Sequence, residues 1–151
     1  MYLSACTFTN GQGKWQPSNF ANDVHITVRQ QQRLMEVRVD QTDGSVAHDV
    51  SLGRGSHEKA LIFKTWLRHA GGTGTTTLAA IARLALWDLD TGVNAVRTVT
   101  VTTDWKRFYV ILDGDVLWYG PGDPMEPRQN IRAEIYLSSG WNFQITEPTL
   151  T

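Results

Sequence analysis

Aromatic side chains are the residues of this chain best suited to bind a ligand. The sequence holds six Trp and four Tyr. Flat rings stack on the apolar faces of sugar rings, while amides and carboxylates bond the sugar hydroxyls. Because the same side chains also fill cores and interfaces, packing is the competing interpretation at each position. Four aromatic residues are the candidate contacts for a glycan or a protein partner: Trp118, Tyr119, Tyr136 and Trp141.

Two pairs of carboxylates are the candidates for acid–base chemistry, Asp88 with Asp90 and Asp113 with Asp115. Glycoside hydrolysis needs two carboxyl groups about 5 to 9.5 Å apart. Both pairs adjoin turn sequences, where Asp is favoured for its hydrogen bonds to the backbone. The sequence contains no nucleophile elbow, phosphate loop or zinc signature. We therefore expect no enzyme and assign no catalytic residue, with a small hydrolase as a competing hypothesis.

Metal-ligating residues are not grouped in the sequence. The four His, at positions 25, 48, 57 and 69, are scattered, and no two have the close spacing of a metal site on a helix or hairpin. His48 falls on an apolar strand face, where a buried core histidine is expected. The one cysteine, Cys6, excludes an internal disulfide. These residues predict no metal site.

The composition is that of an ordinary globular protein, with 41% hydrophobic and 19% charged residues. Lys and Arg total 14 against 15 Asp and Glu. This balance gives no electrostatic bias toward phosphate backbones or anionic membranes, so neither nucleic acid nor a membrane is an expected partner. No segment approaches the about 18 apolar residues of a membrane span, and the first residues lack the pattern of a secretory signal.

Alternation of apolar and polar residues dominates the chain and predicts β-strands, since successive strand side chains point to opposite faces. Turn-forming pairs such as Asp43-Gly44 and Ser139-Gly140 separate the strands. The alternating segments are 24–28, 35–39, 46–52 and 131–137, and the richer segments 60–68 and 105–112 have the composition of strands buried on both faces. About nine short strands predict an all-β fold, an antiparallel β-sandwich formed by residues 1–151 as a single domain.

Residues 75–92, "TTTLAAIARLALWDLDTG", carry two periodicities. Ala and Leu are good helix formers, and Leu78, Ile81 and Ala85 would share one helical face. Ala82, Leu84 and Leu86 also alternate, and Asp-Thr-Gly at 90–92 is typical of a hairpin turn into the strand-like residues that follow. We predict a strand here.

Four segments carry a family likeness, and they occur in a fixed order. They are "FTNGQGKW", with a Phe-x-x-Gly…Trp pattern; "MEVRVDQTDGSVAHDVSLGRG", a strand pair ending in Gly; "TVTVTTDWKRFYV", a Thr-rich strand, a turn and Trp-x-x-Phe; and the closing strand "WNFQITEPTL". Together they resemble the jelly-roll domains of the carbohydrate-binding-module type, which occur in glycoside hydrolase accessory modules and in phage virion proteins. The likeness extends over nearly the whole chain.

The resemblance implies roles for particular residues. It places Trp66, Trp105 and Phe108 at positions that pack in the core. Many glycan-binding members hold a structural calcium with an acidic pair near the start and an Asp in the closing strand, and those places resemble Thr9-Asn10 and Thr146-Glu147 here. This set has less charge than a hard cation prefers, so we expect no cofactor and regard calcium as a weak expectation.

The resemblance also implies a function. A phage virion protein is made in the host cytoplasm and released by lysis, so it needs no secretory signal. A stand-alone sandwich beginning at Met1, without a fibre shaft, is typical of a capsid decoration (cement) protein, which contacts the major capsid protein or another virion protein and is often a homo-oligomer such as a trimer. We therefore predict a non-catalytic virion structural protein on the head surface. The alternative is a glycan-binding module for attachment to the host, of the tail-fibre or accessory-module type.

Residues 113–130, "DGDVLWYGPGDPMEPRQN", are expected to form a long loop at one end of the sandwich. Long loops often carry function. Pro121, Pro124 and Pro127 restrict this segment and lower the entropy that it loses on docking. We predict that the loop contacts another protein subunit, with a glycan as the alternative.

Overall fold

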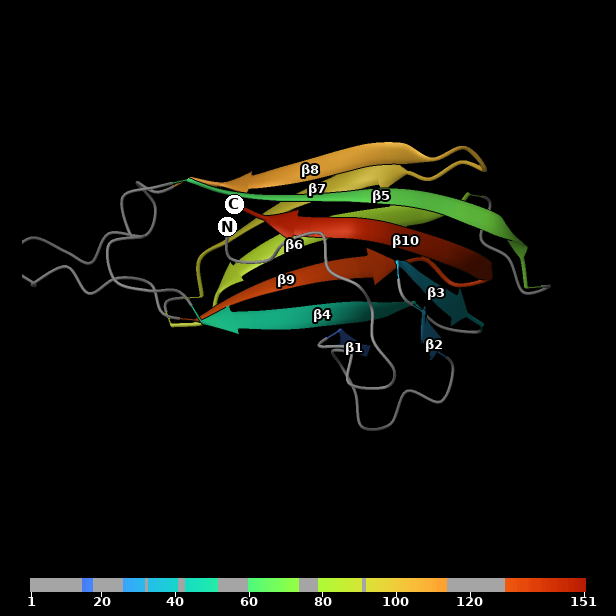
Figure 1. The fold of residues 1–151 in the computed structure, drawn as a ribbon, viewed down its shortest axis with the longest axis horizontal. Helices are drawn as coiled ribbons and strands as arrows, with labels where there is room; N and C mark the ends of the chain where they lie inside the picture. Colours follow the sequence, from blue (N-terminus) through green and yellow to red (C-terminus); the bar gives the residue numbers. More distant parts are fainter. Residues whose placement is uncertain are drawn as a thin grey trace, which may run out of the picture.

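The computed structural model describes residues 15–17, 26–31, 33–40, 43–51, 60–73, 79–90, 92–113 and 130–151. Two antiparallel sheets stack on each other, and β4, β5, β9 and β10 run along the long axis of the molecule (Figure 1). No α-helix occurs in these ranges, so they contain no helix that could span a membrane. The predicted all-β sandwich is confirmed.

Ten strands form the two sheets in the described residues, close to the nine expected. One sheet has the order β1-β4-β9-β6-β7 and the other the order β2-β3-β10-β5-β8. The strands are β1 (Gln16–Pro17), β2 (Ile26–Gln31), β3 (Leu34–Val39), β4 (Gly44–Ser51), β5 (Leu61–Gly72), β6 (Ile81–Asp88), β7 (Asn94–Thr100), β8 (Lys106–Leu112), β9 (Asn130–Leu137) and β10 (Trp141–Leu150).

The core lies between the sheets and is formed by every second residue of the strands. In β5, for example, the alternate residues Leu61, Phe63, Thr65 and Leu67 are fully buried, while Ile62, Lys64 and Trp66 between them face outward. Burial of these side chains supplies the main free energy that holds the sheets together. The largest fully buried side chains are Phe63, Phe143, Met35, Leu61, Leu67, Leu84, Leu86, Leu112, Ile131 and Ile135.

Residues 81–88, the centre of the segment with two periodicities, form strand β6, as predicted. The strand continues into a hairpin with β7, and the backbone closes it through Asp88 N to Val93 O and Gly92 N to Asp88 O. Asp88 Oδ1 accepts a hydrogen bond from Asp90 N at 2.9 Å. Pairing with β7 and β9 satisfies the β6 backbone on both sides, which outweighs the helix propensity of its Ala and Leu.

Trp15 and His48 are buried together between the sheets. Their rings meet edge to face with centroids 5.6 Å apart, and Trp15 stacks on Phe63 of the opposite sheet at 5.9 Å. The buried position expected for His48 is confirmed.

The core positions implied for Trp66 and Trp105 are wrong. Trp105, immediately before β8, is 36% exposed, and the Arg68 guanidinium lies 5.1 Å above its ring. Trp66 is half-buried on the outer side of β5, opposite Arg107 of β8. Phe108 points the other way, is half-buried and packs against the core.

The expectation that 105–112 is buried on both faces is also wrong. Strand β8 is an edge strand, and its outer face holds Tyr109 and Ile111 at 48% and 47% exposure. Its apolar composition therefore does not reflect a central place in the sheet.

Candidate functional site

The outer side of β4, β9 and β6 carries a compact group of polar and aromatic residues. The register aligns them in three rows across the sheet. We call this surface the β9 face. Its rows are Asp49, Arg132 and Trp87; Ala47, Glu134 and Ala85; and Ser45, Tyr136 and Arg83.

Glu134 lies at the centre of the β9 face and is only 4% exposed. Its carboxylate accepts two hydrogen bonds, from the Ser45 hydroxyl at 2.7 Å and from the Tyr136 hydroxyl at 3.0 Å. Its cross-strand neighbours, Ala47 and Ala85, have the smallest side chains of the face. The whole middle row is buried, and a fixed carboxylate lies in it.

Arg132 and Asp49 form a bidentate ion pair beside this row. Arg132 Nε and Nη2 donate to the two Asp49 carboxylate oxygens at 2.7 and 3.1 Å. The hydrogen bond that Arg132 donates to Asp49 raises the pKa of Arg132, and the partial burial of Arg132 opposes that rise. Planar pairs of this kind have a defined geometry. Their remaining donors and acceptors suit neighbouring hydroxyl groups of a ligand.

Tyr136 and Trp87 supply the aromatic surface of the β9 face. The Arg83 guanidinium lies 5.1 Å from the centre of the Tyr136 ring. Partial burial, followed by the nearby Glu134 carboxylate, raises the pKa of Tyr136, and the indole N–H of Trp87 lowers it. Trp87 Nε1 is nevertheless buried without a full hydrogen bond in the described residues. Both rings thus carry a polar group beside a stacking surface.

A hollow of about 340 Å³ opens at the β4 side of the face. It is lined by Gln16, Ala47, His48, Asp49 and Arg132. Its volume is in the range of small-ligand sites, about 300 to 1,000 Å³. The ion pair therefore borders a space large enough for a sugar ring.

The structure describes two of the four predicted contact residues, Tyr136 and Trp141, and they belong to different sheets. Tyr136 lies on the β9 face. Trp141, at the start of β10, packs against the core and against His69, with ring centroids 4.7 Å apart. Trp118 and Tyr119, with the rest of the loop at 114–129, lie outside the described residues.

Arg83, Trp87, Arg132 and Glu134 were missed as site residues. One signal could have found two of them: in "IRAEIYL" the polar residues Arg132, Glu134 and Tyr136 alternate with apolar ones and share a face. The alternation in 81–88 also puts Arg83 and Trp87 on one face, but their place opposite Tyr136 and Arg132 depends on β6 pairing with β9.

The carboxylate pairs have structural roles where the structure describes them. Asp88 is buried and orders the β6–β7 turn, and Asp90 accepts two hydrogen bonds from Asn130, through its backbone N and its side-chain amide, both at 3.2 Å. Asp113 follows β8, and Asp115 is outside the described residues.

The described residues contain no group of three or more His, Cys, Asp or Glu that could hold a metal ion. Of the calcium positions implied by the resemblance, Thr9 and Asn10 are outside the described residues. Thr146 donates its hydroxyl to the Arg33 carbonyl, and Glu147 is exposed.

Comparisons with solved structures support the fold. TmCBM61, solved in complex with β-1,4-galactotriose, has a TM-score of 0.63 at 14% identity, covering 99% of this chain and 97% of that one. The CBM22-1 xylan-binding domain of Xyn10C from Paenibacillus barcinonensis has a TM-score of 0.58 at 8% identity, covering 99% and 92%. This chain is a β-sandwich similar to those of carbohydrate-binding modules.

A phage protein is also among the similar structures. The enzymatically active domain of tailspike protein 4 from bacteriophage CBA120 has a TM-score of 0.58 at 12% identity, and the match covers 97% of this chain and 21% of that one. No protein-family model and no curated protein matches the sequence. The likeness is therefore one of fold.

Proposed function

We propose that this protein is a non-catalytic glycan-binding domain and that its β9 face binds a neutral oligosaccharide. The observation that carries the proposal is the alignment of Trp87, Glu134 and Tyr136 beside the Arg132–Asp49 pair on one sheet. Rings for stacking and fixed hydrogen-bonding groups next to them are the two elements that sugar recognition needs. The likeness to carbohydrate-binding modules supports the same reading.

The charges of the β9 face favour a neutral ligand. Arg132 is paired with Asp49, and Arg83 lies over the Tyr136 ring beside the Glu134 carboxylate. Two cations thus face two carboxylates. A charged ligand would gain little there from unpaired charge, whereas hydroxyl groups can bond to the remaining lone pairs and N–H groups of the Arg132–Asp49 pair.

A catalytic role finds less support in this arrangement. The two described carboxylates of the face are both held by hydrogen bonds, Glu134 by Ser45 and Tyr136, and Asp49 by Arg132. A hydrolase needs one carboxyl group to deliver a proton and another to act on the sugar or on water. The interactions of Glu134 and Asp49 instead suit fixed acceptors.

The comparisons favour glycan binding over capsid decoration, which finds no support in them. The tailspike neighbour supports a narrower proposal, that the domain serves a phage virion in attachment to a cell-surface glycan. Mass spectrometry of purified virions would test it: a few copies per tail are expected, and hundreds of copies on the head would restore the decoration hypothesis.

An array of neutral oligosaccharides, including β-1,4-galactotriose and xylohexaose, tests the binding itself. We expect saturable binding, measured by isothermal titration calorimetry, that is at least about tenfold weaker in Trp87→Ala, since a stacking ring is worth about 1.4 kcal/mol or more. Tyr109→Ala, which removes an exposed ring from the opposite sheet, is the matched control and should bind normally. Absence of any neutral-glycan binding, or equal binding by Trp87→Ala, would refute the proposal.

A further inference from the structure

The outer side of the opposite sheet carries a second group of exposed aromatic and charged residues. On β5 and β8 the register places Lys64 opposite Tyr109 and Trp66 opposite Arg107. We call this surface the β8 face. It consists of Ile62, Lys64, Trp66, Arg107, Tyr109 and Ile111.

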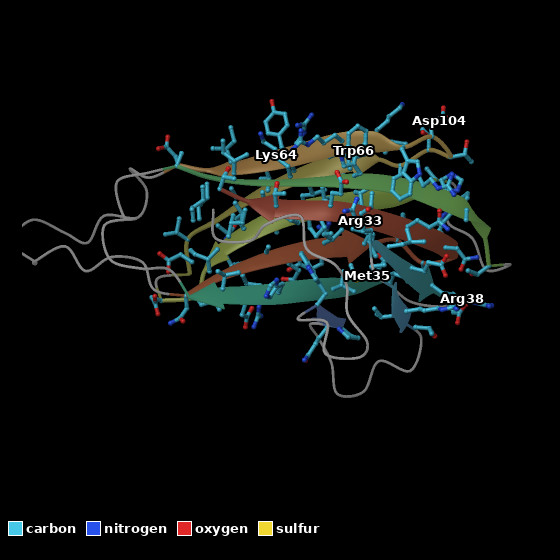
Figure 2. The ribbon with its side chains drawn as sticks, in the orientation of Figure 1. Arg33, Met35, Arg38, Lys64, Trp66 and Asp104 are labelled. Atoms are coloured by element: carbon cyan, nitrogen blue, oxygen red, sulfur yellow. The ribbon has the colours of Figure 1, made fainter. Side chains whose placement is uncertain are left out.

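Both charged residues of the β8 face, Lys64 and Arg107, are cations, and the face contains no carboxylate that could pair with them. Among the described residues, the side chains of Lys64 and Arg107 make no hydrogen bond and no ion pair. The described carboxylates around the face are Asp104 and Asp113, beyond the two ends of β8, and Glu147 on β10. Figure 2 shows Lys64 and Trp66 along β5 and Asp104 in the turn that leads into β8. The middle of the face is therefore cationic.

Tyr109 provides an aromatic surface among these cations. It is 48% exposed, and the Arg97 guanidinium of β7 lies 4.8 Å from its ring centre while Arg97 Nη1 donates to the Tyr109 carbonyl at 3.2 Å. These contacts hold the ring from one side. A hollow of about 370 Å³ lies beside it, lined by Ile62, Lys64, Arg107, Tyr109 and Ile111.

We propose that the β8 face is a second glycan site and that it binds an acidic polysaccharide whose sugars carry carboxylates. Tyr109 offers the stacking surface, and two unpaired cations adjoin it: Lys64, directly across the β5–β8 pair, and Arg107, two residues earlier on β8. A guanidinium matches a carboxylate in geometry and bonds it strongly. The β9 face, with its paired charges, differs in this respect, so the two faces select different ligands.

A second copy of the chain fits this surface less well. A twofold contact would bring Lys64 and Arg107 of one copy against the same cations of the other. Like charges brought together in an interface cost several kcal/mol. An acidic polymer neutralises these cations, and its sugar faces cover the exposed Tyr109 and Ile111.

Affinity electrophoresis in gels containing polygalacturonate tests the proposal, with fully methyl-esterified polygalacturonate as the uncharged matched polymer. We expect retardation by the acidic polymer alone. Affinity should fall about tenfold in Tyr109→Ala and at least as much in Lys64→Gln with Arg107→Gln. It should also weaken between 50 and 500 mM salt, as screening predicts. Trp87→Ala, on the β9 face, should be retarded like the wild type.

Three results would overturn the proposal. Equal retardation by the esterified polymer would mean that the carboxylates of the polymer do not contribute to binding. Equal retardation by polyphosphate or single-stranded DNA, with Tyr109→Ala unaffected, would mean non-specific attraction of polyanions. Concentration-dependent dimerisation abolished by Tyr109→Ala would mean that a second copy covers the face. The β9-face variants are tested on neutral glycans and the β8-face variants on an acidic polymer. Either proposal can therefore be refuted without refuting the other.

Discussion

At the scale of single residues, Glu134 organises the candidate site. A buried carboxylate is costly unless hydrogen bonds compensate the loss of water. Ser45 and Tyr136 supply these bonds, and the three residues belong to adjacent strands. The bonds hold the Tyr136 ring in one orientation, which lowers the entropy lost when a sugar stacks on it.

Tyr136 should titrate above its ordinary pKa of 10.0, because burial and the Glu134 charge both oppose the phenolate. The folded state then holds this proton more tightly than the unfolded state. The resulting contribution to stability is present below pH 10 and is lost as the pH rises through the raised value. A ¹³C NMR titration of the tyrosine Cζ signals checks this. Glu134→Gln should move the pKa of Tyr136 back down; an unchanged value would contradict the assigned cause.

Arg132→Lys separates binding from stability. The ion pair with Asp49 is exposed, with 34% and 55% of the two side chains accessible, so its loss should lower the free energy of unfolding by less than about 1 kcal/mol. The planar guanidinium, which donates to both Asp49 oxygens, is lost, however, and a lysine ammonium cannot reproduce this geometry. Neutral-glycan binding should therefore weaken several-fold by calorimetry while the urea midpoint barely moves. A large stability loss with normal binding would assign Arg132 a structural role only.

At the scale of elements, the β6–β7 hairpin sets the position of Trp87, the last outward residue of β6 before the turn. The turn depends on Gly92, whose φ of 80° is in the left-handed region. No atom lies within 4 Å of a Cβ built there, so a substitution adds strain without a clash.

Gly92→Ala should lower the free energy of unfolding by about 1 kcal/mol, because the cost of the left-handed conformation is only partly offset by the smaller conformational entropy of the unfolded chain. Gly92→Asn should cost less, since Asn tolerates this conformation. Urea denaturation of both variants measures the difference. Equal effects of Ala and Asn would mean that φ is not the cause.

At the scale of the whole molecule, each sheet packs one side against the other sheet and turns its second side away from it. The two outer sides therefore face in opposite directions, and each can carry its own ligand site. The inner sides are joined by large side chains such as Phe63 of β5, which stacks on Trp15 next to β1 of the other sheet.

Phe63→Ala should destabilise the protein by about 3 to 5 kcal/mol, because it removes a fully buried ring and leaves a cavity. Tyr109→Ala removes a ring that is 48% exposed and should cost less than about 1 kcal/mol. Thermal and urea unfolding compare the two. Similar losses in both variants would mean that Tyr109 belongs to the core, and would remove it as a ligand contact.

Local pattern predicted much of the fold. The alternation in 35–39 and 131–137 gave strands β3 and β9, and Asp-Thr-Gly at 90–92 indicated the hairpin. Burial was less predictable. The family resemblance implied core positions for Trp66 and Trp105, yet β5 turns Trp66 outward and β8 is an edge strand. An apolar strand composition cannot distinguish a central strand from an edge strand with exposed rings.

The sequence by itself determined the strands, their turns and the all-β class, because these depend on side-chain alternation and on turn residues close together in the chain. Tertiary structure alone decided the two candidate faces. Asp49, Trp87 and Arg132 meet only because β9 pairs with β4 on one side and β6 on the other. Pairing between distant strands is set by the register that buries all inner faces at once, and no local segment carries that information.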